Sequence, residues 1–179
     1  LVACGGSDDS VRGELIDPPA VVTTLTAAQI DATTAASGLQ ALSGKAKCDV
    51  KVVALNYRTP GAKDGEMSNA SGVMLVPGGM CSSAAPLVAN ARGTEVLKTR
   101  TLANPQDGET FLLAAMYAAQ GYAVVATDYL GYAKSTYAFH PYLHADSQAT
   151  TVIDSVRAAR NAADAVGAKL SGKVLFTGY

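Results

Sequence analysis

The second half of this chain alternates between two hydrophobic patterns, and this alternation limits the folds that it can adopt. Residues 122–129, YAVVATDY, form a continuous apolar run that is typical of a strand buried on both faces of a sheet. Residues 108–121 and 146–166 carry apolar side chains at helical spacing, whereas residues 86–93 and 173–179 favour strands. Strands that alternate with helices predict an α/β protein with a mostly parallel sheet, right-handed crossovers and helices on both faces.

Glycines and one aspartate indicate where the two helices end and begin. Gly121 is a natural C-cap for the first helix, because glycine adopts the left-handed conformation without strain. Asp146 is expected to cap the second helix at its start. Gly167 and Gly172 bracket the exit from that helix and precede the last strand.

The first half of the chain is less regular. Residues 48–59 alternate apolar and polar side chains and residues 70–77 are apolar, so both segments predict strands. The Gly- and Pro-rich turn between them favours an antiparallel pair. Residues 22–43 are rich in Ala and Thr and predict one or two short helices. The expected divisions of the chain are a linker over residues 1–21, a helical segment over residues 22–47 and an α/β domain over residues 48–179.

The composition excludes several classes of function. The chain has 179 residues, of which 49% are hydrophobic, so it can bury a substantial core. The formal net charge is −1, and no run of basic residues indicates binding to nucleic acid. No apolar run approaches the roughly 20 residues that a transmembrane helix needs. Tryptophan is absent, which argues against a module that stacks carbohydrates or bases.

The three cysteines differ in their surroundings. Cys4 lies in LVACGG, which resembles the remnant of a bacterial lipobox, where the cysteine becomes the lipidated first residue; a disordered leader with a stray cysteine is the alternative. The polar residues that follow are expected to form a flexible tether. Cys48 and Cys81 are left as a pair, and in an exported protein they predict a disulfide that stabilises by about 3–4 kcal/mol. Two buried free thiols are the alternative.

Ligands bind beyond the carboxyl ends of the strands in a parallel sheet, and three such ends are recognisable: ARGTE, TDYLGY and LFTGY. The last one matches the first half of the Gly-X-Ser-X-Gly nucleophile elbow, in which a serine sits on a tight turn between a strand and a helix. Gly178 would be the first glycine and Tyr179 the residue before the serine. Many strands end in Gly-Tyr, so these two residues alone do not establish a hydrolase.

Residues 48–179 also resemble the bacterial secreted lipases and esterases of the α/β-hydrolase superfamily. The stretches that match in order and spacing are GVMLVPGG, PLVANARGTE, GETFLLAAMYAAQGYAVVATDYLGYAKS, HPYLHADSQATTVIDSVRAAR and LSGKVLFTGY. The resemblance implies that residues 48–179 are the N-terminal part of an α/β-hydrolase domain. It also implies that the catalytic serine directly follows Tyr179, with the acid and the histidine later in the chain.

The rest of the same protein is therefore the expected partner of this part, and it would complete the sheet. A chain that ends at Tyr179 is expected to carry a modified serine there or to be cleaved, rather than to be truncated. A truncated sheet would expose unpaired backbone groups and a bare apolar face.

The resemblance also indicates an oxyanion hole, for which this fold uses two backbone N–H groups. One belongs to the residue after the serine, and the other comes from the loop after the third strand, here ARGTE. We expect the amide of Thr94 to be that donor, with Gly93 allowing the approach. The family usually has His-Gly at this position, so Arg92 is a departure. Arg92 either holds a substrate carboxylate or fixes the loop through carbonyls or an acidic neighbour.

Other polar residues are expected near the same edge of the sheet. Asp128 is expected to anchor its loop by hydrogen bonds, because the acid of the family's triad follows a later strand. His140 and His144 could bind a metal if they were helical, but the proline between them favours a loop and no third ligand is evident. We expect no metal and predict that both histidines pack at the pocket entrance. Tyr129 and Tyr132 either line the pocket or pack as ordinary aromatic residues.

The sequence therefore predicts a serine esterase or lipase that works through an acyl-enzyme and needs no metal or organic cofactor. An amidase or peptidase on the same fold is the nearest alternative, because the elbow chemistry is shared. A non-catalytic envelope lipoprotein on a degenerate hydrolase scaffold is the other alternative, suggested by Arg92. The expected substrate is a small ester. The expected location is the cell envelope, with a membrane tether through Cys4, or the exterior.

Overall fold

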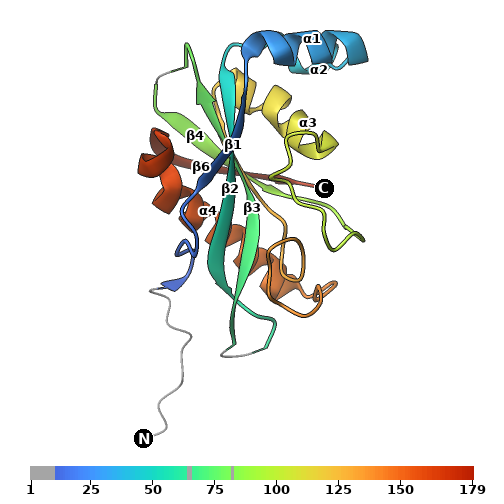
Figure 1. The fold of residues 1–179 in the computed structure, drawn as a ribbon, viewed down its shortest axis with the longest axis vertical. Coiled ribbons are helices and arrows are strands. Elements are labelled where there is room, and N and C mark those ends of the chain that lie inside the picture. The colour runs from blue at the N-terminus through green and yellow to red at the C-terminus, as the bar shows by residue number, and fades with distance from the viewer. Residues whose placement is uncertain (1–10, 64–65, 82) are drawn as a thin grey trace, which may run out of the picture.

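The computed structural model describes residues 11–63, 66–81 and 83–179, and within these residues six strands form one sheet (Figure 1). The strands are β1 (Ala20–Leu25), β2 (Asp49–Pro60), β3 (Met67–Gly78), β4 (Ala85–Ala91), β5 (Ala123–Thr127) and β6 (Leu170–Gly178). They lie in the order β1-β2-β3-β5-β4-β6. Cys4 lies outside the described residues, so the lipobox remains a prediction.

The predicted parallel sheet is confirmed for only half of the strands. β4 lies between β5 and β6 and pairs with both of them in parallel. β1, β2 and β3 pair antiparallel, and β3 joins β5 antiparallel, so the sheet is mixed rather than mostly parallel. The difference follows from the connections. The segment between β2 and β3 is short, which permits an antiparallel pair, whereas a helix connects each of the parallel strands to the next.

Helices cover both faces of the sheet, as predicted. The helices are α1 (Ala27–Ser37), α2 (Gln40–Ser43), α3 (Gly108–Met116) and α4 (Ala145–Val166), and η2 (Ala118–Gln120) is a 3₁₀ turn. The buried side of α4 packs on one face, and α1, α3 and η2 pack on the other (Figure 1). Gly121 ends η2 with a φ of 98°, the left-handed conformation that the sequence predicts there. None of the helices in the described ranges has the length and apolar character that crossing a membrane requires.

The N-terminal segment departs from the prediction. The expected helices are present as α1 and α2, but residues 20–25, which were divided between linker and helix, form β1 on the edge of the sheet. The run of valine and threonine favours a strand, and it pairs with β2. The preceding residues are also not a free tether, because Gly13 N donates to Arg58 O at 2.9 Å and Ile16 N donates to Asn56 O at 2.9 Å.

The start of α4 also differs from the prediction. Asp146 is not the N-cap, because the helix begins at Ala145 and His144 precedes it. The ring of His144 accepts a hydrogen bond from Ser147 N, with Nδ1 and N 3.2 Å apart. Asp146 lies in the first turn instead, where its negative charge is favourable next to the N-terminal end of the helix dipole.

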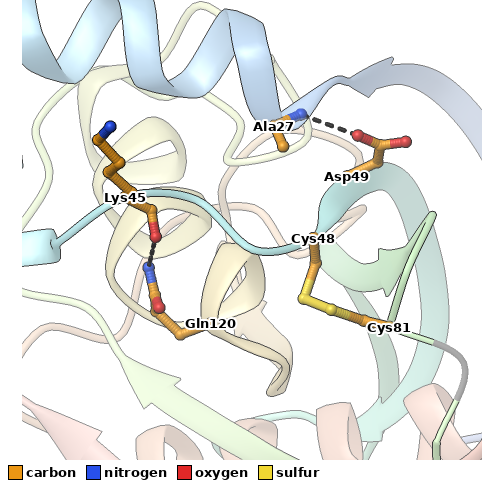
Figure 2. The surroundings of a disulfide bond; sticks show 6 residues. All are labelled: Ala27, Lys45, Cys48, Asp49, Cys81 and Gln120. Carbon is orange, nitrogen blue, oxygen red and sulfur yellow. Dashed lines mark hydrogen bonds between the residues drawn. A yellow bond between two sulfur atoms is a disulfide. The ribbon is translucent and has the colours of Figure 1, made fainter.

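The predicted disulfide between Cys48 and Cys81 is present (Figure 2). It joins residues separated by 33 positions, and their Cα atoms lie 5.4 Å apart. The same region fastens α1 and η2 to the sheet. Asp49 accepts from Ala27 N at 2.8 Å, and Gln120 donates to Lys45 O at 3.0 Å, as Figure 2 shows. The disulfide therefore links the start of β2 to the end of β3, at the edge of the sheet where β4, β5 and β6 begin.

Candidate active site

Three parallel strands end at the opposite edge of the sheet, and their ends converge. Ala91 at the end of β4 is level with Gly178 at the end of β6, and Asn90 is level with Ala126 of β5. The loops after these strands enclose a pocket of about 150 Å³. The pocket lining includes seven of the candidates from the sequence, namely Arg92, Gly93, Thr94, Tyr129, Tyr132, His140 and Tyr179. This is the edge at which ligands bind in α/β proteins.

Gly93 and Gly178 allow the ends of β4 and β6 to approach closely. A Cβ atom on Gly93 would lie 2.5 Å from Cε2 of Tyr179, so the tyrosine ring packs directly over this glycine. A Cβ atom on Gly178 would lie 2.7 Å from the carbonyl oxygen of Ala91. Neither position has room for a larger side chain. The close packing sets the end of β6 beside residues 93 and 94.

Thr94 is one of the residues that line the pocket. The residue is exposed, and within the described ranges its N–H group donates no hydrogen bond to the protein. A backbone N–H that faces a pocket without a protein acceptor is free to bind an oxygen atom of a ligand. Such a donor is what an oxyanion hole needs.

Arg92 is buried beneath this loop, and its side chain is only 1% exposed. Its Nη2 atom lies 3.0 Å from Oε2 of Glu95 and 3.5 Å from Oε2 of Glu109. Its Nε and Nη1 atoms are buried and have no hydrogen-bond partner among the described residues. The guanidinium therefore faces acidic neighbours inside the protein and does not extend into solvent. The contact with Glu95 supplies the acidic neighbour of one interpretation of Arg92, and because Arg92 also lines the pocket, both interpretations stay predictions.

Glu95 is at the centre of an ionic network that the sequence analysis missed. Arg100 pairs with Glu95, and its Nε atom lies 2.7 Å from Oδ2 of Asp107. The N–H of Leu97, followed by the guanidinium of Arg100 and the N–H of Val96, lowers the pKa of Glu95 to about 2. The spacing of Arg92 and Glu95 by three residues was the available signal. Arg100 and Asp107 join the network because the loop after β4 folds back on itself, and no local pattern in the sequence predicts that fold.

Asp128 follows β5 and is completely buried. Its carboxylate accepts hydrogen bonds from the Ser71 hydroxyl at 2.7 Å, the Thr101 hydroxyl at 2.9 Å and Leu102 N at 2.7 Å. Burial raises the pKa of Asp128. These contacts tie the loop after β4 to β3 and β5. Asp128 thus anchors a loop beneath the site, in the manner that the sequence suggested.

The aromatic side of the pocket consists of Tyr129, Tyr132 and His140. The hydroxyl of Tyr129 donates to Arg92 O at 3.3 Å, and the hydroxyl of Tyr132 donates to Glu95 O. The imidazole of His140 packs against both rings, with centroids 5.9 Å from Tyr129 and 4.8 Å from Tyr132. These three side chains are thus held to one another and to the loop after β4.

The second histidine is placed elsewhere. His144 caps α4 and is not among the residues that line the pocket, contrary to the predicted place at its entrance. No group of three or more His, Cys, Asp or Glu side chains that could hold a metal ion occurs within residues 11–63, 66–81 and 83–179. Three further lining residues were not predicted from the sequence, namely Tyr142, Leu143 and Gln148, which come from the segment before α4 and from its first turns.

Comparison with known proteins agrees with this geometry. A family model described as Secretory lipase matches residues 97–179. The rice cell wall degrading esterase LipA from Xanthomonas oryzae is 40% identical and superposes with a TM-score of 0.83 over 94% of this chain. The chain is similar to a secretory lipase family and to this esterase, and it has the α/β-hydrolase fold. It spans 42% of the length of LipA.

Membership of this fold is supported by a more distant structure as well. A putative hydrolase from Legionella pneumophila has a TM-score of 0.80 and covers 92% of this chain and 43% of its own, at 23% identity. That similarity concerns the fold alone. No curated protein matches the chain. The resemblance to the lipase and esterase family, and the α/β-hydrolase fold that it implied, are confirmed.

Proposed function

We propose that this chain forms the oxyanion side of a serine esterase and that the residue after Tyr179 is the nucleophile. The observation that carries the proposal is the contact between Tyr179 and Gly93, which sets the end of β6 beside the free N–H of Thr94. A serine hydroxyl on the residue after Tyr179 would lie at the same edge of the sheet as the N–H of Thr94. The similarity to LipA and to the secretory lipases supports hydrolysis of a carboxylic ester.

The proposed reaction divides the work between this chain and the residues that follow it. The serine oxygen attacks the ester carbonyl, a histidine takes the serine proton, and the carbonyl oxygen becomes negatively charged. Thr94 N–H donates a hydrogen bond to that oxygen. The tetrahedral intermediate collapses to an acyl-enzyme and releases the alcohol, which takes the proton from the histidine. Water then hydrolyses the acyl-enzyme. The removal of one oxyanion donor typically costs about 3–4 kcal/mol of transition-state stabilisation.

Labelling with a fluorophosphonate probe tests this proposal. We expect the complete protein, expressed with everything that follows Tyr179 in its gene, to be labelled on the serine next to Tyr179. Mass spectrometry of the labelled peptide identifies the position, and a variant with alanine at that position is the control. Folded protein that takes no label would contradict the proposal and favour a non-catalytic scaffold, and label on another residue would contradict the position assigned to the nucleophile.

A comparison of esters with matched amides distinguishes an esterase from an amidase or a peptidase. We expect p-nitrophenyl esters to be hydrolysed and p-nitroanilides with the same acyl group to be hydrolysed far more slowly. A preference for the anilides would assign the amidase alternative. A series of acyl chain lengths in the same assay measures the capacity of the acyl site.

We further propose that the protein is exported and lipidated on Cys4. The sequence LVACGG supports lipidation. The disulfide supports an oxidising compartment, because disulfides persist outside the cytosol. Metabolic labelling with an alkyne fatty acid is expected to mark the wild-type protein and not the Cys4→Ser variant. Equal labelling of both proteins, or labelling of neither, would contradict lipidation at this position.

A further inference from the structure

We infer that Tyr129 and Tyr132 are positioning residues that hold the oxyanion loop, defined here as residues 92–95, in its active shape. The inference rests on the proposed function. Tyr129 donates its O–H to the carbonyl of Arg92 at 3.3 Å, which is at the start of this loop. Tyr132 donates its O–H to the carbonyl of Glu95 at the end of the loop. Both tyrosines come from the segment after β5, so one strand end clamps the loop of its neighbour.

These two contacts restrict the direction of the N–H groups in the loop. A peptide group is planar and trans, so its carbonyl and its N–H point in opposite directions. A hydrogen bond to Arg92 O therefore fixes the orientation of Gly93 N–H. The bond to Glu95 O fixes the peptide group between Glu95 and Val96 in the same way. Val96 N also donates to the Glu95 carboxylate at 2.6 Å. Thr94 N–H lies between the two fixed peptide groups.

The tyrosines are themselves held rigidly. Tyr129 has a φ of 69°, an uncommon conformation for a bulky residue, and its N–H donates to the Thr127 hydroxyl at 3.0 Å. Tyr129 and Tyr132 as whole residues are 7% and 8% exposed, and the ring of His140 packs against both of their rings. Nδ1 of His140 lies 3.0 Å from Leu130 O, which fixes that ring as well. The clamp is therefore part of a rigid unit rather than a pair of surface contacts.

Two further features favour a role for the hydroxyl groups beyond packing. Both phenols are protonated donors at neutral pH, and burial raises the pKa of each above its ordinary value. Their partners are main-chain carbonyls of one loop. Ring packing alone does not require either bond. Pre-organised donors are effective in catalysis because they do not need to reorient during the reaction.

The test uses Tyr129→Phe, Tyr132→Phe and the double variant in the complete protein. Phenylalanine retains the ring and removes the donor. We expect each single variant to lower kcat about 10-fold and the double variant about 100-fold, with KM changed little, because small misplacements of a catalytic group cost about this much. We also expect the thermal midpoint to change little and a trifluoromethyl ketone transition-state analogue to bind more weakly in parallel with the fall in kcat.

Tyr137→Phe is the matched control. Tyr137 lies in the same segment, and its hydroxyl is also hydrogen-bonded, to the Glu66 carboxylate at 3.0 Å, but it does not line the pocket. It is expected to keep wild-type kcat. The inference would be overturned if Tyr129→Phe and Tyr132→Phe both kept wild-type kcat. It would also be overturned if kcat fell together with the thermal midpoint while the affinity for the analogue, relative to that for substrate, stayed unchanged. A wild-type protein that neither takes the fluorophosphonate label nor turns over esters would instead overturn the proposed function.

Discussion

Gly93 is a residue at which the candidate site has no room for a side chain. Because a Cβ atom there would lie 2.5 Å from the Tyr179 ring, valine must displace either the ring or the oxyanion loop. We predict that Gly93→Val lowers kcat about 100-fold, as expected when an oxyanion donor is lost. Steady-state hydrolysis of p-nitrophenyl butyrate by the complete protein measures the change.

Gly108→Val is the control for this substitution. Gly108 is the first residue of α3, and a Cβ atom added there would contact nothing within 4 Å. The control is expected to keep kcat within about 2-fold of the wild type, because surface substitutions of this kind have small effects. Equal activity of the two valine variants would show that residue 93 does not constrain the site.

Glu95 gives the loop a stability that depends on pH. Its pKa is about 2 in the folded protein, below the ordinary value of 4.5. A carboxylate with a lowered pKa stabilises the folded state fully above its unfolded pKa, and this contribution is lost as the pH falls through the folded pKa. We therefore predict that Glu95→Gln is less stable than the wild type at pH 7 and that the difference shrinks between about pH 4.5 and pH 2. Thermal unfolding of both proteins across this range is the measurement, and a difference independent of pH would refute the prediction.

The residues of the site were largely predictable, but their partners were not. Gly93, Thr94, Gly178 and Tyr179 follow strands that the hydrophobic pattern reveals, and parallel strand ends meet at one edge. The partners of Arg92 are different, because Glu109 comes from the start of α3. Side-chain pairs between separate elements depend on tertiary packing, which leaves no periodic signal in the sequence.

The disulfide fastens the edge of the sheet opposite to the site. Cys81 lies near Ala85, Ala123 and Leu170, at the beginnings of β4, β5 and β6. We predict that the Cys48→Ser, Cys81→Ser double variant loses about 3–4 kcal/mol of unfolding free energy, the amount expected for a loop of this length. Because the site lies at the other edge, kcat at a temperature where the variant is folded is expected to stay near the wild-type value.

Urea unfolding of the complete protein under oxidising conditions, combined with ester hydrolysis, measures both quantities. The wild type treated with a reducing agent should lose stability by a similar amount. A variant that unfolds like the wild type, or one that stays stable and loses its activity, would contradict this account of the disulfide.

A buried carboxylate on α4 is a second stabilising feature, which the sequence pattern did not predict. The side chain of Asp154 is completely buried and accepts from Arg12, from the Thr59 hydroxyl at 2.8 Å and from Arg157 at 2.7 Å. It thereby holds the N-terminal segment and β2 against the helix. We predict that Asp154→Asn loses about 3 kcal/mol, because a buried charged network that loses one partner leaves the others without compensation.

Asp164→Asn is the control, since Asp164 is an exposed aspartate on the same helix. Its effect should stay within about 0.5 kcal/mol. Thermal denaturation of the two variants is compared with the wild type. The assignment of Asp154 as a structural centre would fail if the two substitutions had equal effects.

The errors of the sequence analysis at the level of helices and strands have local causes. β1 was taken partly as helix because alanine and threonine surround it, although its own residues, AVVTTL, are β-formers. The cap of α4 was assigned to Asp146 because aspartate is a common N-cap, whereas the helix starts one residue earlier, after His144. Propensity identifies that an element exists more reliably than it identifies its first residue.

In the molecule as a whole, the disulfide and the candidate site lie at opposite ends of the parallel strands. One edge of the sheet carries the disulfide, and the other carries the pocket and the oxyanion loop. α4 and the α1–α3 side each form a buried cluster on one face. The alternation of strands and helices predicted this layered arrangement. The antiparallel half of the sheet joins the parallel half through the pairing of β3 with β5, and no single segment of the sequence predicts that pairing.

β6 lies at one end of the strand order and is less covered than the other parallel strands. Leu175 and Phe176 are 49% and 65% exposed, whereas β5 is completely buried. The chain covers 42% of LipA, and we propose that the remaining part of the same protein covers β6 and supplies the rest of the catalytic site. The nucleophile would then lie at the junction of the two parts.

A crystal structure of the complete protein after reaction with a phosphonate inhibitor tests the central claim most directly. The phosphonate mimics the tetrahedral intermediate, and its free oxygen stands in for the oxyanion. The account predicts a covalent bond to the residue after Tyr179 and a phosphonyl oxygen about 2.7–3.1 Å from Thr94 N. A phosphonate bound to another residue, or an oxygen that points away from the oxyanion loop, would contradict it.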